Sequence, residues 1–101
     1  MLPLTITSKA LEEVKAIIKH KNIPKEYGLR IGIKGGGGCV GISYMLGFDK
    51  KKSTDDSYTI DGIDVYIEKK HVMYLVGLEM DYYSGADAQG FNFYKPENES
   101  R

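Results

Sequence analysis

Residues 34–48 read Lys-Gly-Gly-Gly-Gly-Cys-Val-Gly-Ile-Ser-Tyr-Met-Leu-Gly-Phe, and this stretch decides how the chain is organised. Residues 35–38 are four consecutive glycines, which have no side chains to pack and lose the most entropy on ordering. A folded protein keeps such a run where its backbone needs unusual dihedral angles or a close approach. Cys39, the only cysteine of the sequence, follows directly, so any functional interpretation must account for its thiol.

Strand patterns flank the glycine run on both sides. Before it, Leu29, Ile31 and Ile33 alternate with polar residues and glycine. This period of two predicts a strand with one buried face. Residues 42–48 predict a second strand after the run, so the cysteine lies in a connection between two strands.

A helical pattern precedes the first strand. Thr7 or Ser8 can cap a helix whose C-terminal turn is basic, and Pro24 follows shortly after. We expect the helix to end near Asn22 and to lie on the outside of a sheet, because it has one apolar stripe. The apolar positions at helical spacing are Ala10, Leu11, Val14, Ile17 and Ile18.

The remaining chain predicts further strands and one short helix. Residues 49–56 are polar and predict an exposed connection. Residues 57–60 and 63–67 predict a hairpin with a tight turn at Asp61 and Gly62. Residues 68–76 predict a short helix closed by Gly77, and residues 78–83 and 90–94 predict two more strands, the last ended by Pro96.

Composition limits the classes of function. The 101 residues predict one domain, residues 1–101, because a second domain would be too small to stand alone. Fourteen basic and fourteen acidic residues give a formal charge of zero, which favours neither nucleic acid nor an anionic membrane as a partner. No apolar run approaches the roughly 20 residues that span a bilayer, and the start lacks a targeting pattern. A single cysteine cannot form an internal disulfide, which favours a reducing compartment, by default the cytoplasm.

The residues of the loop at Cys39 raise three kinds of chemistry: phosphate binding, nucleophilic catalysis and metal ligation. Phosphate binding lacks a Gly-Lys-Ser/Thr sequence and a following helix. A nucleophilic thiol needs a general base, and the two histidines, His20 and His71, are interpreted as solvated helix-surface residues. Metal ligation remains, although one thiolate is an incomplete site. A symmetric dimer would bring two Cys39 thiols together if the loop lies at the interface.

Several motifs in the same order resemble one known family, the HesB/IscA-like A-type iron-sulfur carriers. In that family the first cysteine stands in a Gly-Cys-x-Gly-x-x-Tyr context, which residues 38–44 match. The similarity covers nearly the whole chain. It also includes Tyr27-Gly28-Leu29-Arg30-Ile31, Leu75-Val76-Gly77, Met80-Asp81-Tyr82 and Gly90-Phe91-Asn92-Phe93.

The resemblance implies a fold and a function. The fold is mainly β (α+β), a compact mixed-sheet sandwich or half-barrel with a flanking N-terminal helix and a second short helix. The function is to bind iron or an iron-sulfur cluster, usually as a dimer or higher oligomer, and to pass it to recipient proteins. Of the family's three cysteine ligands, Cys39 corresponds to the first. The Cys-x-Cys pair has no counterpart in residues 94–101, which read Tyr-Lys-Pro-Glu-Asn-Glu-Ser-Arg.

Our main hypothesis is therefore an assembly or carrier protein that binds iron or a labile cluster through Cys39, shared between two subunits. An external thiol or a tail carboxylate, Glu97 or Glu99, would add ligands. The alternative is a protein that keeps the fold without binding a cluster and acts as an interaction module of the assembly machinery. We expect no enzymatic activity, because neither a base nor a resolving cysteine is evident. The Tyr82-Tyr83 pair predicts at least one outward aromatic ring, a candidate interface residue.

Overall fold

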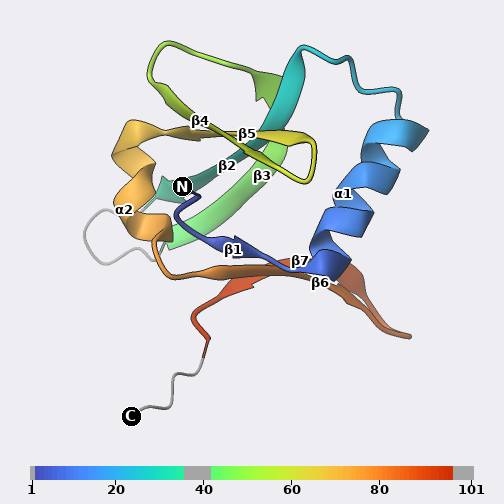
Figure 1. Ribbon diagram of the computed structural model, residues 1–101. Coiled ribbons are helices and arrows are strands. Elements are labelled where there is room, and N and C mark those ends of the chain that lie inside the picture. Colours follow the sequence, from blue (N-terminus) through green and yellow to red (C-terminus); the bar gives the residue numbers. More distant parts are fainter. Residues whose placement is uncertain (1, 36–41, 97–101) are drawn as a thin grey trace.

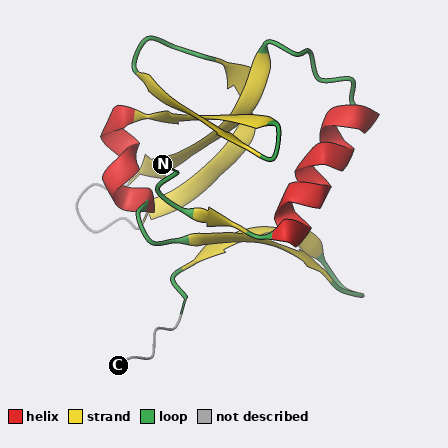
Figure 2. Ribbon diagram, in the orientation of Figure 1, coloured by secondary structure: helices red, strands yellow, loops and turns green. Residues whose placement is uncertain are grey.

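The computed structural model describes residues 2–35 and 42–96. Two β-sheets face each other, with one long helix beside them and a short helical segment on the opposite side (Figure 1, Figure 2). The elements are β1 Thr5–Ile6, α1 Ser8–His20, β2 Tyr27–Gly35, β3 Ile42–Lys50, β4 Asp55–Ile60, β5 Ile63–Glu68, the 3-10 turn η1 Lys69–His71, α2 Val72–Leu75, β6 Glu79–Ser84 and β7 Gln89–Tyr94.

Both sheets are mixed. The larger sheet has the order β3-β2-β5-β4, in which β2 and β5 are parallel and the outer pairs are antiparallel. The smaller sheet has the order β1-β6-β7, with β1 parallel to β6 and β7 antiparallel to it. This arrangement confirms the expected mixed-sheet sandwich with a flanking N-terminal helix and a second short helix.

The core lies between the two sheets and α1. Alternate residues of β2 and β5 point inward, as the period of two predicts. The seven largest side chains with under 2% exposure are Leu29, Ile31, Ile67, Leu75, Met80, Val14 and Val65, and they come from both sheets and both helices. Burial of these apolar side chains stabilises the packing of the two sheets and α1 against one another.

Helix α1 begins at the predicted cap. The Thr7 hydroxyl oxygen accepts a hydrogen bond from the Ala10 N–H at 3.1 Å, and the hydroxyl donates to Asp81 Oδ1 at 2.7 Å. Thr7 therefore caps the helix and also bonds the start of the helix to Asp81 of β6. The helix ends at His20, and Asn22 has a positive φ of 52°, close to the predicted end.

The β4–β5 hairpin confirms its sequence prediction. Ile60 pairs with Ile63, so Asp61 and Gly62 form a two-residue turn. Their φ values are 53° and 82°, the positive pair that a type I′ turn requires. Aspartate followed by glycine tolerates these angles, which is why the turn could be read from the sequence.

Residues 49–56 match the predicted exposed connection only in the middle, where residues 51–54 are exposed and join two strands. Asp49 and Lys50 extend β3, and Asp55 begins β4. The Asp55 side chain is fully buried against Arg30, whose Nη1 and Nη2 atoms donate to its two carboxylate oxygens at 2.8 and 2.7 Å. Lys52 N also donates to Asp55 Oδ2 at 2.7 Å. The prediction was wrong at the two ends of the segment, because a charged pair, rather than an apolar residue, anchors it.

Two further elements differ from prediction. The helix expected over residues 68–76 is divided into the η1 turn and the four-residue α2, closed by Gly77 with φ 83°. Leu75 is the only residue buried along α2, so little apolar surface supports a longer helix. Strand β1 was not predicted, because two residues carry no periodicity; it forms by parallel pairing with Glu79 and Met80.

We expect the free energy of unfolding to fall as the pH drops below about 4, near the ordinary aspartate pKa. Hydrogen bonds from Arg30 hold the pKa of Asp55 below its usual value, and the Thr7 hydroxyl does the same for the pKa of Asp81. Below the unfolded-state pKa, the unfolded chain binds more protons than the folded chain, so acid favours unfolding. Urea unfolding at pH 7, 5, 4 and 3 measures this. Stability that is constant or rising from pH 5 to pH 3 would contradict it.

Candidate functional site

The β2–β3 hairpin carries the segment that contains Cys39. Its strands pair without interruption from Tyr27 opposite Lys50 to Gly35 opposite Ile42. Gly35 has a φ of 83°, a conformation that favours glycine, at the last described residue before the loop. Cys39 itself, with Gly38 and Gly41, lies outside the described residues. The element after the loop is a strand, as predicted, so the helix N-terminus of a phosphate-binding loop is absent there.

The end of β7 meets the start of β3. Tyr44, the third residue of β3, stacks on Phe93 with ring centroids 5.1 Å apart and an interplanar angle of 28°. Phe93 precedes the last residue of β7. The stack therefore places the point where the C-terminal tail leaves the sandwich beside the hairpin that carries Cys39. The tail carboxylates Glu97 and Glu99 lie outside the described residues.

His71 lies against β2 rather than in solvent. Its side chain has 16% exposure, and its Nδ1 atom is 3.0 Å from the position that a Cβ on Gly32 would occupy. Its Nε2 atom is 3.8 Å from Glu68 Oε1. The interpretation of His71 as a solvated residue was wrong because glycine at position 32 leaves space for the imidazole. His20, at the end of α1, is exposed as expected.

Exposed apolar side chains gather at the same end of the molecule. The Cε atom of Met45 is 3.8 Å from the position that a Cβ on Gly32 would occupy, next to the His71 ring. Tyr94 of β7 pairs with Glu79, the first residue of the strand that follows α2. Figure 1 shows α2 beside the starts of β3 and β6. We call this surface the α2 end; its exposed members are Tyr44, Met45, Met73, Tyr74, Val76 and Tyr94. Six of the seven large exposed apolar residues in the described chain belong to it, and the concentration is typical of an interaction surface.

The seventh residue of that set, Tyr83, is 57% exposed near the turn between β6 and β7. Its neighbour Tyr82 packs edge to face against Phe91, with centroids 4.9 Å apart. The prediction that one ring of the Tyr82-Tyr83 pair points outward is therefore confirmed, and its use as an interface stays a prediction.

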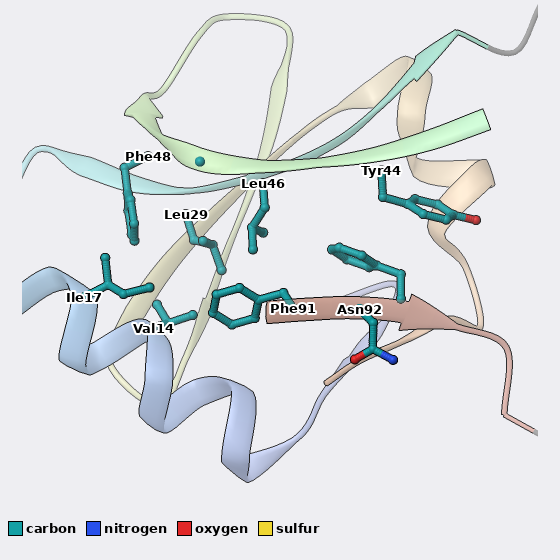
Figure 3. A pocket seen from close by; sticks show the side chains of 10 residues that line it. Val14, Ile17, Leu29, Tyr44, Leu46, Phe48, Phe91 and Asn92 are labelled. Atoms are coloured by element: carbon teal, nitrogen blue, oxygen red, sulfur yellow. The ribbon is translucent and has the colours of Figure 1, made fainter. Parts of the chain in front are cut away.

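An apolar cleft of about 480 Å³ separates α1, β3 and β7. Leu46, Phe48 and Leu29 point into it from the larger sheet, and Phe91 faces them from β7 (Figure 3). Val14 and Ile17 of α1 close one side. The cleft has no charged residue in its lining, so it offers packing surface rather than acid-base chemistry.

The donor set of the described chain does not complete a metal site. Within residues 2–35 and 42–96, no three His, Cys, Asp or Glu side chains are grouped closely enough to hold a metal ion. The sequence adds the single thiol of Cys39. Structural metal sites and clusters usually need about four protein donors. A site built on Cys39 therefore needs donors from the tail, a second subunit or an external thiol.

The mixed β-sandwich and the glycine-rich sequence around Cys39 are the two features to compare with known protein families. Residues 2–99 match the iron-sulphur cluster biosynthesis family, so the chain belongs to that family. Among curated relatives, the mitochondrial iron-sulfur cluster assembly 1 homolog of Mus musculus is 39% identical over 94 residues, covering 92% of this chain and 70% of the relative. The Homo sapiens homolog is 38% identical over the same coverage.

Solved structures share the fold. Escherichia coli SufA, described as involved in biosynthesis of iron-sulfur clusters, has a TM-score of 0.74 and 25% identity, covering 95% of this chain and 82% of its own. A protein from Aquifex aeolicus has a TM-score of 0.71 and 33% identity, covering 95% and 94%. IscA with a [2Fe-2S] cluster has a TM-score of 0.75 at 24% identity, covering 92% and 85%, which shows likeness of fold.

Neither α1 nor the short segment around α2 combines the length and apolar character needed to cross a bilayer, among the residues that the structure describes.

Proposed function

We propose that this chain carries iron or a labile iron-sulfur cluster as cargo, held through the thiolate of Cys39 and shared between two copies of the chain. Membership of the cluster biosynthesis family supports this class of cargo. The observation that carries the proposal for this chain is the Tyr44–Phe93 stack, because it joins the base of the cysteine hairpin to the start of the C-terminal tail. Thiol and tail carboxylates would then serve one site.

Sharing between subunits follows from the number of thiolates. One chain contributes one thiolate, whereas a two-fold dimer contributes two from equivalent positions. Glu97, Glu99 or a small external thiol would supply the remaining donors. Thiolates favour soft metals and iron-sulfur clusters, while a site completed by carboxylates holds such cargo more weakly. A weakly held cluster suits a protein that passes its cargo on, and no reaction of its own is proposed for the chain.

We expect Cys39→Ser to abolish cluster assembly. Anaerobic reconstitution with iron, sulfide and a thiol should give the wild type visible charge-transfer absorbance and retained iron after desalting. The variant should retain neither, because a hydroxyl does not replace a thiolate as ligand to a cluster. Ser43→Ala is the matched control, since Ser43 is an exposed neighbour on β3.

Two outcomes decide between our hypotheses. Equal iron and absorbance in wild type and Cys39→Ser would remove Cys39 as the ligand. A folded wild type that never retains iron would favour the alternative, an interaction module that uses the α2 end without cargo. Sedimentation of the reconstituted wild type should show a dimer, and a strictly monomeric loaded protein would overturn the shared site.

The partners and the compartment belong to this proposal. Recipient proteins or assembly proteins would dock on the α2 end, whose exposed members include Met73 and Tyr74 of α2. A reducing compartment is expected because a free thiolate ligand must stay reduced. The mouse and human relatives are mitochondrial by name, and we expect a cytoplasmic location for this chain, which cell fractionation would test.

A further inference from the structure

Lysines gather at one end of the molecule although the whole chain is neutral. Residues 19–30 and 49–55 contain seven basic and three acidic side chains, which is a net charge of +4. Since the formal charge of the chain is zero, the remaining residues carry −4. The balanced total therefore conceals an uneven distribution of charge. We call this end the basic end; its exposed lysines are Lys19, Lys21, Lys25, Lys50, Lys51 and Lys52.

Backbone pairing brings the two lysine-rich segments together. Tyr27 lies opposite Lys50 at the end of the β2–β3 ladder, and Lys50 Nζ is 5.9 Å from the centre of the Tyr27 ring. The Tyr27 N–H donates to Pro24 O at 3.0 Å, so the turn that carries Lys25 adjoins the same point. Figure 1 shows the connection from α1 to β2 and the connection from β3 to β4 at one end of the molecule. The six lysines belong to one surface.

The acidic residues of the basic end mainly compensate its arginine. Arg30 Nε donates to Asp49 Oδ2 at 3.2 Å, and Nη1 and Nη2 donate to the Asp55 carboxylate at 2.8 and 2.7 Å. The third carboxylate of the two ranges is Glu26, which is exposed. Six lysines are therefore set against one carboxylate that is not bound to Arg30.

Side chains of neighbouring elements change this balance little. The β4–β5 turn adds Asp61, which pairs with Lys15 at 2.7 Å, and Asp64, which lines a pocket together with Lys25. When Lys15, Asp61 and Asp64 are counted, the net charge of this end is still +3. The segments around η1 add two lysines and two carboxylates, which cancel; they are Lys69, Lys70, Asp56 and Glu68.

Lys51 and Lys52 are well placed to meet a partner. Both are exposed in the connection between β3 and β4, outside either strand, so they do not shield a strand edge. The hydrogen bond from Lys52 to Asp55 Oδ2 uses the backbone N–H, at 2.7 Å, which leaves the ammonium group for other contacts. Lys19 and Lys21 differ, because cations there complement the C-terminal end of the α1 dipole.

The surroundings of these lysines favour a protein partner over nucleic acid or lipid. Residues 19–30 and 49–55 are all described, and no large apolar or aromatic side chain among them is exposed. Base stacking and membrane insertion both need such side chains. Arg30, the only arginine in the two ranges, is held by carboxylates, so it is not available to bind phosphate bidentately. Lysines act as point charges on flexible stems, which suits carboxylates spread over a protein chain.

We propose that the basic end docks a carboxylate-rich segment of a partner protein, at a site separate from the cargo site. The Tyr27–Lys50 pair is at one end of the β2–β3 ladder, and the Gly35–Ile42 pair, next to the cysteine loop, is at the other. Eight residue steps separate the two pairs, about 26 Å at 3.3 Å per residue. An acidic partner held at the basic end leaves the α2 end uncovered. The contact anchors the chain and does not depend on the cargo.

The test uses the full chain with Cys39→Ser, kept free of metal, so that cargo plays no part. The probe is a fluorescently labelled oligoglutamate peptide, whose anisotropy measures binding at about 0.01 M and about 0.15 M salt, where the screening lengths are about 30 and 8 Å. The peptide should bind at low salt and weaken at least about tenfold at the higher salt, because exposed charges are screened. No binding at low salt overturns the proposal.

Two double variants locate the binding surface. Lys51→Glu with Lys52→Glu should weaken binding at low salt by about tenfold or more, because the attraction becomes repulsion. Lys9→Glu with Lys95→Glu is the matched control: it changes the net charge equally at exposed lysines outside the basic end, and should bind within about twofold of the parent protein. Equal losses in the two variants overturn the proposal.

A neutralising pair keeps the test valid if charge reversal disturbs folding. Lys51→Gln with Lys52→Gln adds no carboxylate near Asp49 and Asp55, and should still weaken binding several-fold more than Lys9→Gln with Lys95→Gln. Urea unfolding of each variant checks that it is folded. Equal binding by the two neutralised proteins would contradict a site at the basic end.

Two further probes test the class of partner. They are a single-stranded oligothymidylate and vesicles of phosphatidylserine and phosphatidylcholine in equal parts. At the same concentration of negative charge, each should bind more weakly than oligoglutamate. Tighter binding of the oligonucleotide or of the vesicles overturns the assignment to an acidic protein. Failure of iron reconstitution would leave these results unchanged, because the Cys39→Ser chain carries no cargo in any of them.

Discussion

Asp55→Asn should lower the free energy of unfolding by about 3–5 kcal/mol, the cost of breaking a buried ion pair from one side. Arg30 is 14% exposed and donates two hydrogen bonds to the Asp55 carboxylate, which is fully buried. An amide of the same shape removes the buried partner of the guanidinium and leaves it only the longer contact from Arg30 Nε to the half-exposed Asp49 Oδ2, at 3.2 Å. The Lys52 N–H that bonds to Asp55 Oδ2 would also face a neutral acceptor. Urea unfolding at pH 7 measures the loss.

The neighbouring aspartate supplies a control for this result. Asp56 forms an ion pair with Lys69 at 2.9 Å, but both side chains are exposed to solvent. Exposed pairs contribute little to stability, so Asp56→Asn should leave the unfolding midpoint almost unchanged. Equal effects of the two substitutions would show that the Arg30–Asp55 pair has no special role. A loss below about 1 kcal/mol for Asp55→Asn would do the same, because that is the ceiling for a surface pair.

Leu75→Ala should cost about 2–5 kcal/mol, the range for removing a buried leucine side chain from a core. Leu75 has 0% exposure and is the only residue buried along α2, so it anchors the four-residue helix to the sandwich. Its truncation leaves a cavity between α2 and the sheets. Thermal and urea unfolding measure the loss, and hydrogen exchange should show faster opening of residues 69–77.

The adjacent Met73 is the matched control. It lies in the same helix and is 75% exposed, so Met73→Ala should change stability by less than about 0.5 kcal/mol. If Leu75→Ala and Met73→Ala were equally mild, α2 would not depend on its buried leucine. If Leu75→Ala also weakens iron retention while Met73→Ala does not, the support of α2 for the cysteine hairpin would be demonstrated.

The sequence predicted the elements whose signals are local. Thr7 capped α1 as expected, and Asp61 with Gly62 formed the hairpin turn, because capping and positive φ depend on the residues themselves. Alternation of apolar residues in β2 predicted its buried face. The family's motifs predicted the mixed-sheet sandwich and the cluster biosynthesis class, which the family match confirmed. The role of Cys39 stays a prediction.

Long-range contacts were not readable from the sequence. Arg30 and Asp55 are 25 positions apart in the sequence. The residues next to each of them do not indicate that the two form an ion pair. The residues around Asp55 are polar, so the segment was predicted to be an exposed connection. Only the pairing of β2 with β5, and of β5 with β4, brings the carboxylate under the guanidinium. Burial of a charge depends on what the fold places around it.

The same distinction applies to the candidate site. The sequence alone determined that a glycine run and one thiol join two strands, because glycine content and alternation are local properties. The tertiary structure decided that the end of β7 lies beside this hairpin, through Tyr44 and Phe93, 49 positions apart in the chain. It also decided that His71 fills the space above Gly32, and that β3 lies at the edge of the larger sheet. These relations depend on sheet order and register, which are set by contacts between distant residues.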